Sequence, residues 1–213
     1  MLGVFHWIVQ GLTEVLRVLY QITNSYGVGI ILLTLAVRLL LYPLTISQVR
    51  AMAGMRELAP KLKELQEKYK DRPQEYQRRM MDLYKEHKVN PFGGCLPLLL
   101  QFPVFIALYY VFRDFPYGGA GFLWLSNLAK PDPYWVLPIL NGVTMYFQMQ
   151  STSTGDASQK TMVLFMPIMM AWISVSLPSG LVLYWIVSNV FSWVQQIYMN
   201  RQFQLPKGGT GAK

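Results

Sequence analysis

The sequence predicts an all-α, polytopic membrane protein with five transmembrane helices around a hydrophilic groove. The first observation is composition: of the 213 residues, 53% are hydrophobic and only 14% are charged. The second is the distribution of charge, because most charged residues lie between Arg50 and Lys88 and long stretches elsewhere contain none. The third is a set of five apolar runs, each close to the roughly 20 residues that a helix needs to cross a bilayer. Together these features are typical of a membrane protein with one polar insert.

The first segment, residues 1–24, is predicted to be an amphipathic helix lying in the outer interface of the membrane. Its polar residues recur every three or four positions and form one narrow helical stripe, which consists of His6, Gln10, Thr13, Glu14, Arg17 and Gln21. A sixth span is the alternative interpretation. The segment lacks the basic start and the A-x-A cleavage site of an ordinary signal peptide.

Five predicted spans follow within a single domain, 1–213. Their ranges are 26–48, 95–113, 134–150, 161–177 and 180–199. The third and fourth spans are short, which indicates a locally thin bilayer or a helix pair that leans on its neighbours. An outer loop at 114–133, a cytoplasmic loop at 151–160 and a cytoplasmic tail at 200–213 complete the predicted layout.

Residues 50–90 are predicted to form a helical hairpin in the cytoplasm. The stretch from Arg50 to Lys88 holds 11 basic and 7 acidic residues in a helical composition with close opposite-charge pairs. Asp71-Arg72-Pro73 is a turn pattern between the two arms, with the proline suited to begin the second helix. The hairpin is either a solvated connector or an arm that docks a partner, and the sequence favours neither.

The distribution of Lys and Arg predicts the orientation. Apart from Arg38, 15 of these residues fall on the side that holds the hairpin, the 151–160 loop and the tail, and 3 fall on the other side. Because cytoplasmic loops carry the excess of positive charge, the N-terminus is expected outside and the C-terminus in the cytoplasm. The net charge of +8 therefore indicates a membrane surface rather than nucleic acid.

Arg38 stands near the middle of the apolar run Tyr26–Ile46, where a charged residue costs about 2.5–3.5 kcal/mol on insertion scales. None of the five spans contains Asp or Glu, so the sequence offers no counter-ion at the same depth. The 12 residues from Arg38 to Arg50 correspond to roughly 18 Å of helix, too far for the side chain to reach the cytoplasmic surface. We therefore expect a water-filled cavity that is open to the cytoplasm.

Other polar residues within the predicted spans share helical faces. Asn141, Thr144 and Gln148 follow one another at i, i+3 and i+7. With polar residues of the second and fifth spans they make up the predicted lining of the groove: Arg38, Gln101, Asn141, Thr144, Gln148, Ser188, Ser192 and Gln195. The alternative for the uncharged members is hydrogen bonding between helices, worth about 0.6 kcal/mol per contact. That alternative does not account for Arg38.

Several functions are disfavoured by what the spans lack. Both histidines, His6 and His87, and all the acids lie outside them, whereas cation-coupled transporters carry such residues at membrane depth. The sequence has no Gly-rich phosphate loop, no HExxH and no GxSxG, so we predict no enzyme, no metal and no cofactor. A small anion channel or transporter that uses Arg38 for selectivity remains an alternative. So does an assembly factor that chaperones folding without inserting anything.

The run NPFGGCLPLLLQFPVFIALYYVFR, residues 90–113, resembles the second-span signature of the YidC/Oxa/Alb membrane protein insertases. LPSGLVLYWIVSNVFSWVQQ, residues 177–196, is similar to the fifth span of that family. The pattern around Arg38, followed by YPLT and a charged hairpin, is similar as well. The resemblance covers residues 20 to 200, and the size and layout look like the shorter bacterial members.

The resemblance implies a membrane protein insertase and chaperone of the bacterial plasma membrane that uses neither nucleotide nor metal. Its partners would be nascent membrane proteins with acidic extracellular segments, the lipid bilayer, the Sec translocon and the ribosome. The family's core arginine corresponds to Arg38, and its cytoplasmic hairpin to Arg50–Lys88. Many members contact the ribosome through a long basic tail, whereas the tail after Met199 is short here and carries three basic residues.

Overall fold

The computed structural model describes the chain except for residues 1, 88, 90–95, 119–120, 154–156 and 203–213. The regular secondary structure of the described part is helical, which confirms the predicted all-α class. The helices are α1 (Leu2–Thr23), α2 (Tyr26–Leu40), α3 (Tyr42–Lys68), α4 (Pro73–Glu86), α5 (Leu96–Asp114), α6 (Val136–Thr152), α7 (Ala157–Ser174) and α8 (Ser179–Gln202).

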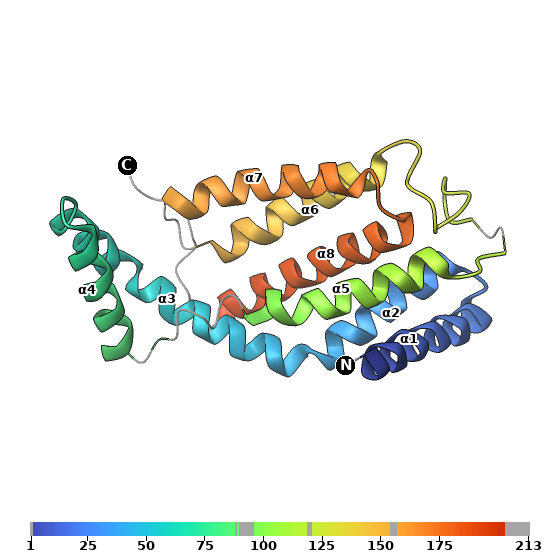
Figure 1. Cartoon of the computed structure of the whole chain (residues 1–213), viewed down its shortest axis with the longest axis horizontal. Helices are drawn as coiled ribbons and strands as arrows, with labels where there is room; N and C mark the ends of the chain where they lie inside the picture. The colour runs from blue at the N-terminus through green and yellow to red at the C-terminus, as the bar shows by residue number, and fades with distance from the viewer. Residues whose placement is uncertain (1, 88, 90–95, 119–120, 154–156, 203–213) are drawn as a thin grey trace.

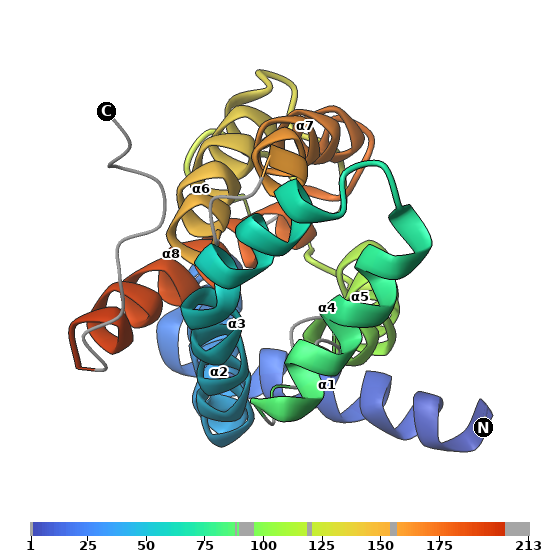
Figure 2. The same cartoon turned by 90° about the vertical axis from the view of Figure 1, so that its left-hand side faces the viewer.

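Six helices lie lengthwise beside one another, and the α3–α4 hairpin projects from one end (Figure 1). The most extensive packing joins α6 to both α7 and α8, α2 to α8, and α1 to α2. Seen from the hairpin end, α5, α2, α8 and the α6–α7 pair are arranged in a ring (Figure 2). Within the described residues, no helix combines the length and hydropathy needed to cross a membrane.

The main hydrophobic core lies at the end of the bundle that carries the 114–133 loop. Side chains of α1, α2, α5, α8 and this loop contribute to it, and several are completely buried: Leu16, Ile30, Leu108, Phe112, Leu128 and Leu181. Burying each such side chain stabilises the fold by about 1.5–3 kcal/mol relative to exposure. The core therefore closes this end of the bundle against water.

The predicted first span, 26–48, is not one continuous helix. α2 ends at Leu40, and α3 begins at Tyr42 and runs on through the first arm of the predicted hairpin (Figure 1). Pro43 lies in the first turn of α3, where its missing N–H costs no hydrogen bond. Hydrophobicity continues across this break, so the hydrophobic pattern of the run Tyr26–Ile46 did not reveal it and Pro43 was its only sign.

Other boundaries also differ from those predicted. The 151–160 loop is largely helical, because α6 continues to Thr152 and α7 begins at Ala157. α8 continues past residue 199 to Gln202, while the rest of the predicted tail lies outside the described residues. In each case a polar helix end extends beyond the apolar run, since helix formation does not stop where hydrophobicity does.

The predicted hairpin is present as the far part of α3 and the whole of α4. A small second core holds the two arms together, in which Leu58 and Leu62 of α3 pack on Tyr84 of α4. Lys61 and His87 add a hydrogen bond of 2.8 Å between the arms. The remaining faces of the arms are largely exposed and charged.

The connection from α5 to α6 is fixed by a buried carboxylate. Asp132, which is 3% exposed, accepts hydrogen bonds from the backbone N–H groups of Tyr134 (3.0 Å) and Leu137 (2.7 Å) and from the indole of Trp124 (3.0 Å). Leu137 lies in the first turn of α6, where free N–H groups favour a negative charge. Asp132 thus fastens the loop to the start of α6.

Candidate functional site

Arg38 lies on the last turn of α2, and its side chain is half-buried. Its Nε atom is buried and has no hydrogen-bond partner among the residues that the structure describes. The guanidinium interacts electrostatically with Tyr184 of α8, a residue that is 1% exposed. The guanidinium therefore faces α8, and no carboxylate pairs with it within the described part of the chain.

α8 carries three of the predicted residues between Tyr184 and its C-terminal end. Ser188 is 1% exposed, while Ser192 and Gln195 are half-buried. Ser188 Oγ and Gln195 Nε2 are buried, and neither finds a hydrogen-bond partner among the described residues. Buried polar atoms without protein partners are rare in folded proteins and are commonly satisfied by water.

α2 and α8 run in the same direction from the loop end of the bundle, as Figure 1 shows. Their first turns lie in the hydrophobic core, with Ile30 and Leu33 from α2 and the stretch 181–184 from α8. Arg38 and Ser188 follow only after this apolar part, toward the hairpin end. The surroundings of the site are therefore apolar toward the loop end and polar toward the hairpin.

Asn141 and Thr144 belong to a separate hydrogen-bond network. Asn141 is 1% exposed and donates to Ser174 Oγ of α7 at 2.9 Å. Asn189 of α8 donates to Asn141 Oδ1 at 3.1 Å and reaches Thr144 Oγ1 at 3.5 Å. Three helices are thereby joined, which is the arrangement that the sequence left open as interhelical hydrogen bonding.

The two remaining predicted residues are glutamines. Gln148 is half-buried on α6, one turn beyond Thr144, and its backbone carbonyl accepts a hydrogen bond from Ser151. Gln101 belongs to α5, but its side chain lies outside the residues whose side chains are described. The structure thus places Arg38 on α2 beside Tyr184 of α8, with Ser188 and Gln195 further along α8, and places Asn141 and Thr144 between α6, α7 and α8.

Sequence reasoning missed Ser174 and gave Asn189 no role, although both hold the network together. Each is a polar residue within an apolar run, and this was the only feature of the sequence that could have indicated its role in the network. Asp132 was also missed, because an acid in a predicted outer loop gives no reason to expect burial. Tyr117 is a fourth case: its hydroxyl is buried without a partner in the described structure, and burial raises the pKa of its phenol.

Comparison with known proteins supplies the family. Residues 18–207 match the model of the 60Kd inner membrane protein family. The chain belongs to this family. Members named membrane protein insertase YidC include one from Wolinella succinogenes, 46% identical over 199 residues, and one from Geobacter sulfurreducens, 42% identical over 207 residues. The alignments cover 92% and 94% of this chain but 37% and 38% of those proteins, so the chain spans little more than a third of their length.

A solved structure of a 60Kd inner membrane protein relative, an active YidC insertase with its first transmembrane domain resolved, has the same fold. It superimposes with a TM-score of 0.77 at 33% identity, covering 91% of this chain and 46% of the other. The predicted resemblance to this family is thus confirmed. The number of spans and the lining of the groove remain predictions.

Proposed function

We propose that this member of the 60Kd inner membrane protein family is a membrane protein insertase of the bacterial plasma membrane. The observation that supports it is the group of buried polar atoms on Arg38, Ser188 and Gln195, which lack partners among the described residues. One fixed positive charge surrounded by uncharged polar groups is suited to hold a hydrophilic polypeptide segment. The relatives named membrane protein insertase YidC support the same function.

The mechanism follows from the cost of moving polar chain through hydrocarbon. An extracellular segment of a nascent protein must pass about 30 Å of apolar core. A wet site entered from the hairpin end shortens the dry part of this path to the thickness of the hydrophobic core at the loop end. Arg38 attracts acidic side chains of the segment, and this attraction is strong because the surroundings have a low effective dielectric constant.

The apolar helix of the client moves separately into lipid. Exposed apolar side chains cover the outer faces of α5 and α7, among them Phe102, Ile106, Phe165 and Ile168. A client helix can pass along such faces without leaving an apolar environment. Its burial in the bilayer, at about 25 cal/mol per Å² of apolar surface, supplies the driving force without a nucleotide.

In this proposal the N-terminus lies outside and the C-terminus in the cytoplasm, so that the hairpin and the entrance to the site face newly made chains. Partners would be nascent membrane proteins with acidic extracellular segments, together with the bilayer. The Sec translocon and the ribosome are further proposed partners. The charged faces of α3 and α4 are the surface that we expect such partners to meet.

The test uses liposomes that contain only this protein and a small single-span client with an acidic extracellular segment. We expect Arg38→Ala to reduce insertion at least about 10-fold, since a charge-assisted contact is worth about 1.5–3 kcal/mol. Arg38→Lys should retain most of the activity. Insertion is measured by protection of the client from added protease.

Two controls sharpen this test. A client whose acids are replaced by Asn and Gln should be inserted equally by the wild type and by Arg38→Ala. Lys130→Ala removes an exposed cation of the 114–133 loop, away from the hairpin, and should leave insertion unchanged. Normal insertion of the acidic client by Arg38→Ala would disprove the electrostatic role, and anion flux without insertion would indicate a channel instead.

A further inference from the structure

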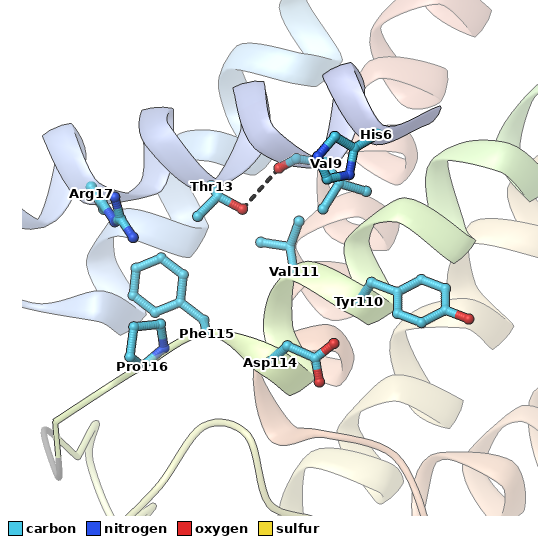
Figure 3. A pocket seen from close by; sticks show the side chains of 9 residues that line it. All are labelled: His6, Val9, Thr13, Arg17, Tyr110, Val111, Asp114, Phe115 and Pro116. Carbon is cyan, nitrogen blue, oxygen red and sulfur yellow. Dashed lines mark hydrogen bonds between the residues drawn. The ribbon is translucent and has the colours of Figure 1, made fainter. Parts of the chain in front are cut away.

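A cavity that Arg38 does not line lies between α1 and the end of α5. It has a volume of about 410 Å³, within the range of small-molecule sites. Its lining residues, shown in Figure 3, are His6, Val9, Thr13, Arg17, Tyr110, Val111, Asp114, Phe115 and Pro116. Part of the polar stripe of α1 thus faces a pocket.

The pocket has one cation and one anion on opposite walls. Arg17 extends from α1 toward Phe115, and Asp114 lies on the α5 side (Figure 3). Each also has an exposed neighbour of opposite charge: Glu14 at 2.9 Å from Arg17, and Arg113 at 2.7 Å from Asp114. These pairs leave donors on the guanidinium and lone pairs on the carboxylate for a ligand. Hydrogen bonding from Arg113 lowers the pKa of Asp114, which keeps this carboxylate ionised.

The floor and surroundings of the pocket are apolar. Val9, Val111, Phe115 and Pro116 supply apolar lining. The face of α1 that turns away from the core exposes large apolar side chains at helical spacing: Trp7, Val15, Val18 and Ile22. An exposed face of this kind on a helix that is otherwise packed on the bundle is suited to lipid.

A second apolar stripe leads directly into the pocket. Phe102, Ile106 and Tyr110 follow one another at i, i+4 and i+8 on α5, and all three are exposed. Tyr110 is itself part of the pocket lining. A hydrocarbon chain lying on this stripe would therefore end where Arg17 and Asp114 begin.

We propose that this pocket binds the head group of a zwitterionic aminophospholipid of the bilayer, such as phosphatidylethanolamine. The phosphate lies against Arg17, the ammonium group against Asp114, and one acyl chain follows Phe102 and Ile106. The balanced charge of the lining favours a zwitterion over an anionic lipid, because only a zwitterion uses both the free donors of Arg17 and the lone pairs of Asp114 that its pair with Arg113 leaves. The apolar stripe favours a lipid over free phosphate.

The experiment is native mass spectrometry of the full chain in detergent, titrated separately with phosphatidylethanolamine, phosphatidylcholine, phosphatidylglycerol and inorganic phosphate. We expect one phosphatidylethanolamine to bind at least about 10-fold more tightly than the other lipids. Phosphatidylcholine binds less well because its quaternary ammonium has no N–H to donate to Asp114. The measurement involves no client, so its result is independent of the proposed insertion.

Two variants test the contributions of Arg17 and Asp114 to lipid binding separately. Arg17→Gln should weaken phosphatidylethanolamine binding about 10-fold, whereas Asp114→Asn should abolish the preference over phosphatidylglycerol. Lys130→Gln removes an exposed cation of the 114–133 loop and should change nothing, and circular dichroism checks that each variant is folded. Equal binding of all lipids to all variants would overturn the proposal in favour of non-specific contact. Displacement of the lipid by inorganic phosphate would overturn it in favour of a free-phosphate site.

Discussion

At the scale of single residues, buried polar groups divide into two kinds. Asp132, Asn141 and Ser174 have protein partners and hold elements together. Arg38 and Ser188 have buried atoms that lack partners within the described structure. A satisfied polar group contributes to stability, whereas an unsatisfied one is retained against its cost, which is typical of a functional site. Arg38 and Ser188 thus differ from the residues of the scaffold that have partners, although the core residue Tyr117 also has a buried hydroxyl without a partner in the described structure.

Asp132 provides a prediction at this scale. Asp132→Ala would leave the Trp124 indole and the N–H groups of Tyr134 and Leu137 without acceptors, and we expect it to lower the free energy of unfolding by about 3 kcal/mol. Asp132→Asn keeps one acceptor oxygen and should cost less. Thermal unfolding in detergent measures both, with the exposed Asp114→Ala as a control. Equal melting temperatures for all four proteins would contradict the assigned role.

The sequence pattern predicted some residues of the site but not the residues that they contact. The position of Arg38 in a long apolar run without acids led to the prediction of a water-filled cavity, which stays a prediction, and the structure shows a half-buried side chain. The spacing of Asn141 and Thr144 correctly placed them on one face of α6. Periodicity does not reveal what a face packs against, however, so the contacts with Asn189 and Ser174 could come only from tertiary structure.

At the scale of elements, the apolar runs predicted where helices exist better than where they begin and end. The break at Leu41 lies within continuous hydrophobic sequence, and only Pro43 marked it. The sequence also gave no sign of where two elements approach each other closely. Gly27 at the start of α2 is such a case, because a Cβ atom there would lie 2.0 Å from Cγ of the Phe122 ring in the 114–133 loop.

Gly27→Ala should therefore displace Phe122 and destabilise the protein by about 1–3 kcal/mol, the usual cost of overpacking. Phe122→Ala in the same chain should recover most of the loss, because it removes the ring that the new methyl group meets. Melting temperatures of the two single variants and the double variant test this coupling. Strict additivity of the two changes would contradict it. Gly11→Ala, where a Cβ would meet nothing within 4 Å, is the matched control.

At the scale of the whole molecule, polarity changes along the parallel helices α2 and α8. Their first turns form the hydrophobic core at the loop end, and their later turns carry the polar site toward the hairpin. The proposed function expects water to enter from the hairpin end only. An insertase needs one wet entrance, whereas a channel needs two.

Accessibility to a membrane-impermeant maleimide tests this gradient. In a Cys95→Ser background, cysteines at Arg38, Ser188 and Gln195 should react from the hairpin side and stay unreactive from the loop side. Cysteines at Leu108, which is fully buried, and at Ile168, which is exposed and apolar, should react from neither. Labelling of the three sites from both sides would support a channel, and no labelling at all would mean that the site is dry.

The break at Leu41 also has a mechanical consequence. α3 starts at Tyr42, four residues after Arg38, and extends over 27 residues, about 40 Å, into the hairpin. If α3 turns as one unit despite the internal Pro60, a rotation of about 5° at its base moves its far end by roughly 3.5 Å. Conversely, a protein that binds the hairpin would apply a rotational force to the last turn of α2, which carries Arg38. Force applied to the arm and the position of Arg38 are therefore mechanically coupled.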